Sequence, residues 1–219
     1  MAYQLFYSPG ACSLAVHIVL EELGQPFDLR LVSTADGSTK TAEYLAFNPK
    51  GRVPVLLIPG ESQPLTELPA IVTYLARRHP KGGLLPNDPL AEARCHEWLA
   101  WLVGWVHGMG FGELWRPERF SADSTTHAAI RSNGETLIHD GFQRIEDLLT
   151  EQTHTQTLGY TLVDPFLLVL YRWGEKIGMP MGRPYPIWTA RMRDVVARPA
   201  VARALDKEGV NVPEIAVGQ

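Results

Sequence analysis

The stretch NPKGRVPVLLI, residues 48–58, decides the fold of this chain. Two prolines and a glycine set a bend, and the apolar run that follows is typical of a buried strand. The bond between Val53 and Pro54 is an X-Pro bond, the kind in which a cis peptide is accessible. A cis bond would turn the backbone N–H and C=O of Val53 outward, so an extended peptide could pair with them like an added strand. The alternative is a plain turn with a trans proline.

The segments on either side of this stretch alternate between strand and helix patterns. Including the strand at 55–58, the expected strands and helices are at 4–7, 13–23, 27–32, 41–47, 55–58, 64–66 and 69–78. Their order is βαβαββα. Strands and helices first alternate and a hairpin then follows, which predicts a small mixed α/β sheet with helices on both faces.

The chain changes character after this α/β region. A segment rich in Pro and Gly follows it and is typical of a linker. The remaining patterns are helical, at 90–115, 125–149, 162–177, 186–196 and 199–205. We therefore expect an α/β domain at 1–79, a linker at 80–89 and an all-α domain at 90–219.

The composition excludes several classes of partner. The 219 residues carry a net charge of −4 and no basic run, so neither nucleic acid nor an anionic membrane is expected as a partner. The first residues have no positive region and no long apolar run, so we expect no signal peptide or membrane span and a cytoplasmic address. Two cysteines make no disulfide scaffold, and neither has a partner at zinc spacing, so no metal site is expected.

Cys12 is the first candidate for chemistry. It follows the turn SPGA at 8–11, where a strand gives way to a helix. The unpaired N–H groups and partial positive charge of a helix start favour a thiolate, so we expect a lowered pKa and a nucleophilic sulfur. The alternative is a small residue buried at the helix start. Cys95 lies within an apolar helical stretch and is expected to be a packing residue.

Glu67 is the second candidate, at the start of the helix 69–78. A carboxylate there could hold an ammonium group while nearby N–H groups hold a carboxylate, as the end of a free α-amino acid requires. The alternative is a glutamate that merely suits the helix dipole. The pattern TLVD at 161–164 is a helix-start capping pattern, to which we assign a structural role.

The stretch 90–115 holds four of the six tryptophans. We expect most of them to pack in the core or an interface, and Trp105 and Trp115 to edge an apolar pocket with Tyr7 and Gly108. Glycines recur along this stretch and each weakens a helix by about 1 kcal/mol relative to Ala, which predicts a kink or a close helix approach. His107 among them is either a site residue or a satisfied core histidine.

The order and spacing of SPGACS at 8–13, NPKGRVP at 48–54, LTELPAIVTYL at 65–75 and TLVD at 161–164 resemble the glutathione transferase superfamily. The resemblance runs over nearly the whole chain. The Cys12 motif and His107 are most similar to the bacterial Beta class. The resemblance implies a thioredoxin-like domain followed by an all-α domain, which is the glutathione transferase fold.

The resemblance also implies roles for individual residues. Cys12 and His107 would be catalytic, with Cys12 facing the sulfur of glutathione. Val53–Pro54 would pair with the cysteinyl part of glutathione, and Glu67 would bind its γ-glutamyl end beside the N–H of Leu68. The implied activity is detoxification: conjugation of the co-substrate glutathione to small hydrophobic electrophiles, or reduction of mixed disulfides through Cys12. Proteins similar to this one are usually homodimers.

Some positions depart from the family pattern. Leu68, followed by Pro69, replaces the Ser or Gly that the family has after the glutamate, and the loop 35–38 lacks the family's lysine, for which Lys40 is a candidate substitute. Ala100 replaces an asparagine of the first long helix, and Gly108 replaces a lysine after the histidine. A lost hydrogen bond to a charged group costs about 1.5–3 kcal/mol, so we expect weakened glutathione binding. The alternative function is a transferase-fold binding protein that sequesters apolar ligands or docks a partner.

Overall fold

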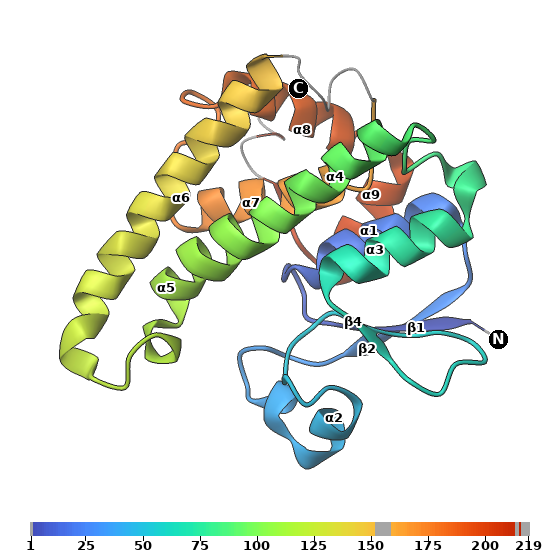
Figure 1. Ribbon diagram of the computed structural model, residues 1–219, viewed down its shortest axis with the longest axis horizontal. Coiled ribbons are helices and arrows are strands. Elements are labelled where there is room, and N and C mark those ends of the chain that lie inside the picture. The colour runs from blue at the N-terminus through green and yellow to red at the C-terminus, as the bar shows by residue number, and fades with distance from the viewer. Residues whose placement is uncertain (1, 152–158, 213–214, 216–219) are drawn as a thin grey trace.

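A four-stranded mixed sheet forms the N-terminal part of the computed structural model, which describes residues 2–151, 159–212 and 215 (Figure 1). Its strands, in the order β2-β1-β3-β4, are β1 (Tyr3–Tyr7), β2 (Phe27–Leu31), β3 (Val55–Leu57) and β4 (Leu65–Thr66). Strand β1 is parallel to β2 and antiparallel to β3, and β3 is antiparallel to β4. The mixed sheet expected from the sequence is therefore confirmed.

Helices cover both faces of this sheet. Helices α1 (Ser13–Leu23) and α3 (Leu68–Arg78) lie side by side on one face, and α2 (Ala42–Phe47) lies on the other (Figure 1). Helix α1 ends as expected, because Gly24 adopts the left-handed conformation with φ of 60° and closes the helix through its N–H. Nine consecutive residues of α1 are buried, since α1 also contacts α7 and α9 of the helical part.

The C-terminal part is mostly helical and contains no strand among its described residues. Its helices are α4 (Pro89–Trp101), a π-helix (Leu102–Phe111), α5 (Gly112–Trp115), α6 (His127–Thr150), α7 (Asp164–Lys176), α8 (Pro186–Val196) and α9 (Pro199–Glu208). Short 3₁₀ turns lie at Ser38–Lys40, Pro80–Gly82, Pro117–Arg119 and Ser124–Thr126. The single helix expected over 90–115 is therefore replaced by α4, a π-helix of ten residues and the short helix α5, which follow one another without a break.

The glycines of the π-helix allow α6 to approach closely. A Cβ on Gly110 would lie 2.9 Å from Cγ1 of Ile138, and a Cβ on Gly134 of α6 would lie 2.7 Å from the carbonyl oxygen of Gly110. Real Cβ atoms do not tolerate such distances, so both positions need glycine. The close helix approach predicted from the glycine-rich sequence is confirmed at Gly110.

The capping pattern is present at the start of α7, and the hydrogen bond to the Asp164 carboxylate is shorter than the bond to the Thr161 hydroxyl. The N–H of Thr161 donates to Oδ2 of Asp164 at 2.8 Å, and the hydroxyl of Thr161 accepts from the N–H of Val163 at 3.3 Å. Arg191 of α8 forms an ion pair with the same buried Asp164. Helix α7 begins at Asp164, two residues after the expected start, because Thr161 to Val163 form the capping turn.

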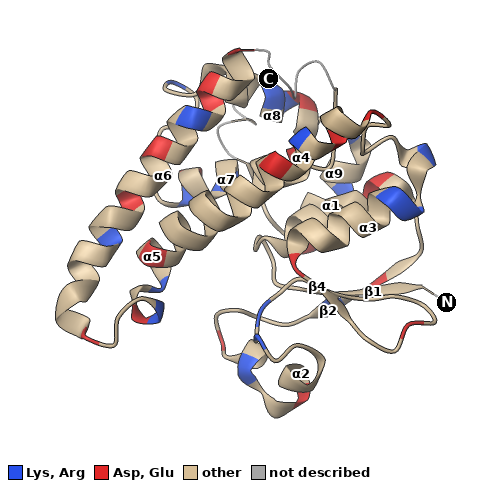
Figure 2. Ribbon diagram, viewed as in Figure 1, with Lys and Arg blue, Asp and Glu red and all other residues tan. Residues whose placement is uncertain are grey.

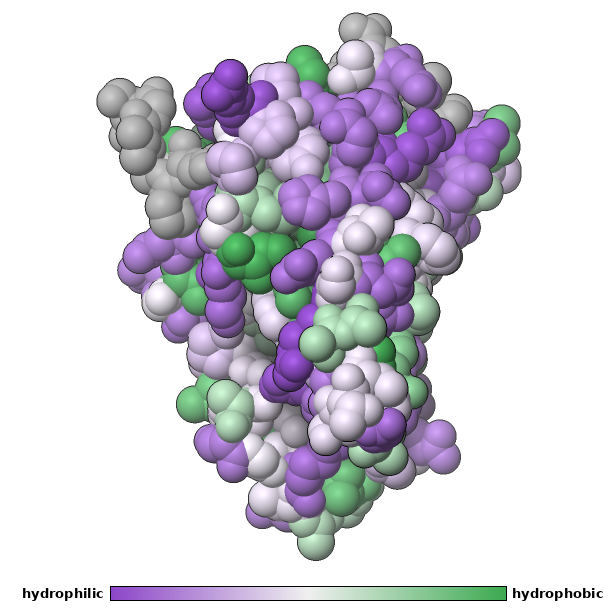
Figure 3. Space-filling view, turned by 90° about the vertical axis from the view of Figure 1, so that its left-hand side faces the viewer, coloured by the Kyte–Doolittle hydropathy of each residue, from purple (hydrophilic) through white to green (hydrophobic). Residues whose placement is uncertain are grey.

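One hydrophobic core passes through both parts of the chain. It includes Leu14 and Ile18 of α1, Phe166 of α7 and Val201 of α9, all fully buried. Charged residues of both signs occur along α4 and α6 (Figure 2), and on the face shown in Figure 3 apolar residues occur in small groups among polar ones. Among the described helices, none is both long and apolar enough to cross a membrane.

Candidate active site

Cys12 lies where the loop after β1 enters α1. The loop is closed on itself, because the N–H of Ser8 donates to Oγ of Ser13 at 3.1 Å and the N–H of Ala11 donates to the carbonyl of Ser8 at 3.0 Å. The Sγ of Cys12 does not cap the helix. It points to the carbonyl oxygen of Val53, 3.5 Å away, and only 9% of the residue is exposed. The sequence-predicted thiol and the 48–54 bend are therefore brought together.

The expected lowering of the Cys12 pKa is wrong in this structure. Burial raises the pKa of the Cys12 thiol to about 12, and the carboxylate of Glu67 adds to the rise. The N–H groups of Cys12 and Ser13 and the charge of Arg52 act in the expected direction, but they are outweighed. The free energy lost when a thiolate is removed from water exceeds the free energy gained from the N–H groups at the helix start. The free protein therefore holds Cys12 as a thiol at neutral pH.

The bend at 48–54 is held by hydrogen bonds from α2 and from the residue that follows it. The peptide bond between Val53 and Pro54 is cis, which excludes the alternative of a plain turn with a trans proline. The carbonyl oxygen of Arg52 accepts two hydrogen bonds of 2.7 Å, from the Tyr44 hydroxyl and from Nδ2 of Asn48. These bonds hold the Arg52 carbonyl in place, and with it the adjoining Val53 backbone that faces Cys12. 

Lys40 is the candidate substitute for the loop lysine that the Beta class has, and it lies against the bend at 48–54. A Cβ built on Gly51 would sit 2.6 Å from Nζ of Lys40, and Gly51 has a φ of 61°. The positive φ, and the backbone oxygen of Thr39 at 2.9 Å from such a Cβ, favour glycine at position 51. The distance to Nζ also places the Lys40 ammonium beside the loop that carries Val53.

Glu67 stands at the exposed end of the candidate site. It is the residue before α3 and has a φ of 72°, the only positive φ of a non-glycine residue among those described. A strained conformation of this kind persists where the surroundings require it, and such residues cluster at functional sites. The carboxylate pairs with the ammonium of Lys50, whose Nζ also donates to the Thr66 hydroxyl at 2.7 Å.

Leu68 begins α3 and sends its side chain into the core. It is 4% exposed and belongs to the main hydrophobic cluster. The first N–H groups of a helix have no acceptor within the helix, so the Leu68 N–H is available to a ligand. Pro69 follows and has no N–H. Leu68 can therefore serve a ligand only through its backbone, as the sequence indicated.

His107 is half-buried on the π-helix and faces α7. Its ring stacks on Trp173 with centroids 5.2 Å apart and meets the edge of Phe166 at 6.0 Å. Burial lowers the pKa of His107 to about 4, and the charges of Arg52 and Arg119 lower it further. The imidazole is therefore neutral near pH 7 and can exchange hydrogen bonds, but it carries no charge that would stabilise a thiolate.

The residues expected to edge an apolar pocket are only partly assembled. Trp115 packs at 4.7 Å from Phe111 and 4.9 Å from Trp173, so it joins the aromatic group around His107. Trp105 is 47% exposed and Gly108 is exposed, on a different side of the π-helix from the buried positions. Among the described rings, Tyr7 pairs with His17 and not with the Trp115 group. Among the described rings, neither Trp105 nor Tyr7 contacts Trp115, so a pocket shared by these residues stays a prediction.

Sequence reasoning missed Trp173, which is central to this aromatic group. Its Nε1–H donates to the carbonyl oxygen of Gly10 at 2.9 Å, so it joins α7 to the Cys12 loop. Nothing in the local pattern distinguishes it from the other apolar residues of α7. The charges of Arg52 and Arg119 near His107 were also missed, because they reach it from two distant segments. Within residues 2–151, 159–212 and 215, no three potential metal ligands gather.

A mixed sheet with a cysteine at the start of its first helix, opposite a cis-proline bend, defines a thiol-binding protein of thioredoxin-like architecture. Comparisons with known proteins narrow this class. Residues 10–78 match the family model of the glutathione S-transferase N-terminal domain. The chain is 32% identical to the glutathione S-transferase GstA of Escherichia coli O157:H7 over 94% of its own length and 99% of that protein. The chain belongs to the glutathione S-transferase family.

Solved structures agree with this assignment. A glutathione transferase homologue from Sulfitobacter with bound glutathione superposes with a TM-score of 0.87, at 30% identity, over 94% of this chain and 98% of that one. A Beta-class glutathione S-transferase from Sphingomonas chungbukensis superposes with a TM-score of 0.81, at 31% identity, over 95% and 100% of the two chains. The resemblance to the Beta class and the glutathione transferase fold are confirmed.

Proposed function

We propose that this chain binds glutathione between Cys12, Val53 and Glu67 and uses it as the co-substrate of a transferase. The observation that carries the proposal is the position of the Cys12 Sγ, 3.5 Å from the carbonyl of Val53 in the cis-proline bend. The cysteinyl part of glutathione would pair with the Val53 backbone, and its thiol would then lie at Cys12. The γ-glutamyl ammonium would meet the Glu67 carboxylate, and its carboxylate the first N–H groups of α3.

Two reactions suit this arrangement. In conjugation, the glutathione thiolate attacks a small apolar electrophile held against the aromatic group of Phe111, Trp115 and Trp173. In disulfide reduction, the Cys12 thiolate attacks a mixed disulfide of glutathione, forms a bond to the glutathione sulfur and releases the other thiolate. A second glutathione thiolate then attacks this bond, releases glutathione disulfide and restores Cys12.

His107 contributes a neutral imidazole to these steps. Because its pKa is lowered to about 4, it can accept a hydrogen bond from a thiol but remains a weak base. The Cys12 pKa, raised to about 12 by burial, means that the thiolate must form when ligand groups enter the site. We assign the formation of the reactive thiolate to the complex and not to the free protein.

The proposal extends to a homodimer that works in detoxification in the cytoplasm. Large apolar side chains are exposed on the helical part, with Leu90 at 66%, Trp105 at 47% and Met109 at 39%, and such residues suit a contact between protein surfaces. Light scattering of the purified protein tests the dimer directly. The alternative, a binding protein without transferase activity, has no support from the relatives, which are named as transferases.

Retention on immobilised glutathione tests the binding. We expect the parent protein to be retained and to elute with free glutathione, and Glu67→Ala to be retained less. In solution we expect glutathione-dependent turnover of an aryl halide or of a mixed disulfide. A folded parent protein that is neither retained nor active would contradict the proposal.

A further inference from the structure

Three arginines, Arg52, Arg116 and Arg119, flank the candidate site from both parts of the chain, and we call them the arginine cluster. Arg52 directly precedes Val53 of the cis-proline bend. Arg116 and Arg119 belong to the turn that follows α5, where Figure 2 shows positive residues. Nη1 of Arg116 donates to the carbonyl oxygen of Trp115 at 3.0 Å. The cluster therefore adjoins both the bend beside the thiol and the aromatic group.

The members of the cluster lie close enough to act on one another and on His107. Burial lowers the pKa of His107 most, and the charges of Arg52 and Arg119 lower it further. Partial desolvation of the Arg119 guanidinium, and then the charges of Arg52 and Arg116, lower the pKa of Arg119. The carboxylate of Glu118 acts on Arg119 in the opposite direction. Charges in water are screened over about 8–10 Å, so the three guanidinium groups gather beside His107. 

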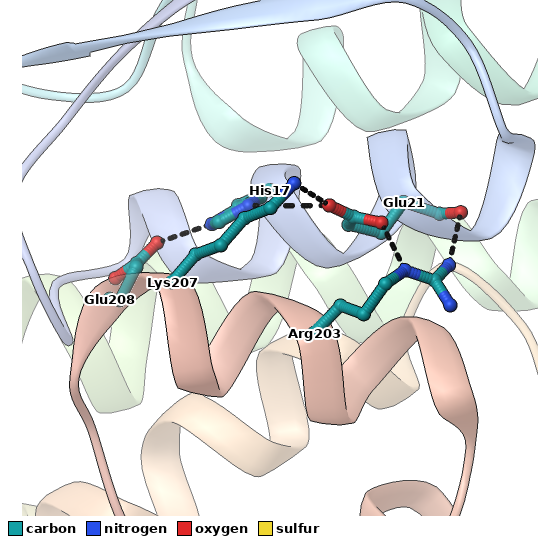
Figure 4. A network of polar contacts seen from close by, with 5 residues as sticks. All are labelled: His17, Glu21, Arg203, Lys207 and Glu208. Carbon is teal, nitrogen blue, oxygen red and sulfur yellow. Dashed lines mark hydrogen bonds and ion pairs between the residues drawn. The ribbon is translucent and has the colours of Figure 1, made fainter.

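The arginine cluster lacks the carboxylate partners that cations have elsewhere in this chain. On α9, for example, Nε of Arg203 donates to Oε2 of Glu21 at 2.7 Å, and Nζ of Lys207 donates to Oε1 of the same carboxylate at 2.6 Å (Figure 4). No ion pair between described residues involves a member of the cluster. Like charges repel, so a bound anion would offset the repulsion among the three cations.

We propose that the electrophile carries a carboxylate and that Arg119 binds this group, with Arg116 and Arg52 beside it. The inference rests on the proposed function, because it names the class of electrophile that the same site accepts. The apolar body of the electrophile would lie against Trp115 and Trp173, and its carboxylate would reach the turn that follows Trp115. The planar fork of an arginine can bond both oxygens of a carboxylate, which makes Arg119 a residue that determines specificity.

Glutathione is the other source of a carboxylate, because its glycyl end is also anionic. The glycyl residue follows the cysteinyl part, which we assign to Val53, and the ammonium of Lys40 lies beside the loop that carries Val53. Arg116 and Arg119 instead belong to the helical part and adjoin the aromatic group to which we assign the electrophile. Their position therefore favours the carboxylate of the electrophile over that of glutathione.

The test compares two aryl halides that differ in charge: a chlorodinitrobenzoate with its chlorine para to the carboxylate, and the methyl ester of the same compound. In both, the sulfur of glutathione bonds to the ring carbon that carries chlorine, chloride leaves with the electron pair of the broken bond, and the thiol proton passes to solvent. Arg119 is exposed, so its replacement should leave the fold intact. We expect Arg119→Met to lower kcat/KM for the carboxylate about tenfold, mainly through KM, and for the ester by less than about twofold. Arg119→Lys keeps the charge and should recover part of the loss.

Three controls separate the cluster from a general effect of charge. Arg193→Met removes an exposed arginine of α8 and should leave the turnover of both compounds unchanged. Added salt should lower kcat/KM of the parent protein for the carboxylate more than for the ester, and this measurement needs no variant. By titration calorimetry, Arg119→Met should bind glutathione as tightly as the parent protein does.

Equal effects of Arg119→Met on the carboxylate and the ester would overturn the inference, and so would an equal loss in Arg193→Met. A matching loss of glutathione affinity in Arg119→Met would also overturn it, because the arginines would then bind the glycyl carboxylate. In each of these cases the ester is still turned over and the proposed function stands. A folded parent protein that turns over neither compound would instead contradict the proposed function, and the inference with it.

Discussion

At one end of the site Cys12 and Val53 are 9% and 8% exposed, whereas at the other end the side chains of Glu67 and Lys50 are 59% and 46% exposed. The buried end raises the pKa of its thiol to about 12 and is anchored by residues of α7 and α9. The exposed end holds an ion pair in water, where such pairs contribute at most about 1 kcal/mol. We therefore expect changes at the thiol end to alter reactivity, and changes at the carboxylate end to alter glutathione binding by smaller amounts.

The largest effect that this comparison predicts is the loss of disulfide reduction in Cys12→Ser. The proposed reaction passes through a bond to the Cys12 sulfur, so we expect the rate of glutathione-dependent reduction to fall on the order of a hundredfold or more. Glutathione affinity should change much less, because Glu67 and the Val53 backbone are untouched. Turnover of a mixed disulfide and titration calorimetry measure the two quantities. Cys95→Ser is the control and should retain the parent rate; a fully active Cys12→Ser would place the reaction elsewhere.

The buried thiol also makes stability depend on pH. The pKa of Cys12 rises from an ordinary value of 9.0 to about 12 on folding, so above pH 9 the unfolded chain loses a proton that the folded chain keeps. The contribution of Cys12 to the free energy of unfolding should therefore be constant below pH 9 and should fall by up to about 1.4 kcal/mol per pH unit above it.

Cys12→Ala removes this contribution, so its free energy of unfolding should fall less steeply than that of the parent between pH 9 and 10. Denaturant titrations under reducing conditions at pH 8, 9 and 10 measure the slopes. Equal slopes in the two proteins would mean that the thiol is not held protonated by burial.

The secondary structure of the N-terminal part could be predicted because its signals are local. Gly24 closes α1, and the Pro-rich bend precedes β3, so the ranges 13–23 and 48–58 identify a helix and a strand without any distant contact. The sequence did not predict the π-helix, nor the close contact of its Gly110 with Gly134 of α6. The sequence showed that this stretch contains weak helix formers, but it did not show that α6 would pack against them.

The candidate site likewise contains residues that local motifs identify and residues that only distant contacts identify. Cys12, Val53 and Glu67 lie in short motifs and could be named from the sequence. The direction of the Cys12 pKa shift could not be predicted, because burial is created by residues far along the chain. Trp173 and Glu208 bond to Gly10 across 163 and 198 positions, and no local pattern marks such partners.

A smaller effect is expected at Leu68, between the two ends. Its side chain is buried, so Leu68→Ser and Leu68→Ala should both lose stability, about 2–5 kcal/mol for the alanine variant. A serine hydroxyl that turned from the core toward the start of α3 would bond a carboxylate held there, which alanine cannot do. We expect glutathione to bind Leu68→Ser about tenfold more tightly than Leu68→Ala by titration calorimetry. Equal affinities would show that another group already satisfies that carboxylate.

The smallest effect is expected at Lys50, and it tests the exposed end alone. In the free protein the Lys50 ammonium occupies the Glu67 carboxylate, the group to which we assign the ammonium of glutathione. Binding must exchange one cation for another, and the exposed pair that is broken is worth at most about 1 kcal/mol. Lys50→Met should therefore tighten glutathione binding by no more than about fivefold, and added salt should reduce the difference.

Lys81→Met removes the same charge at an exposed site in the 3₁₀ turn Pro80–Gly82 and should leave the affinity unchanged. Calorimetric titrations of both variants at low and high salt decide between two roles of Lys50. Tighter binding means that Lys50 competes with the ligand for Glu67. Binding weakened tenfold would mean that Lys50 holds the ligand carboxylate instead, and the exposed end would then contribute to affinity on the same scale as the buried one.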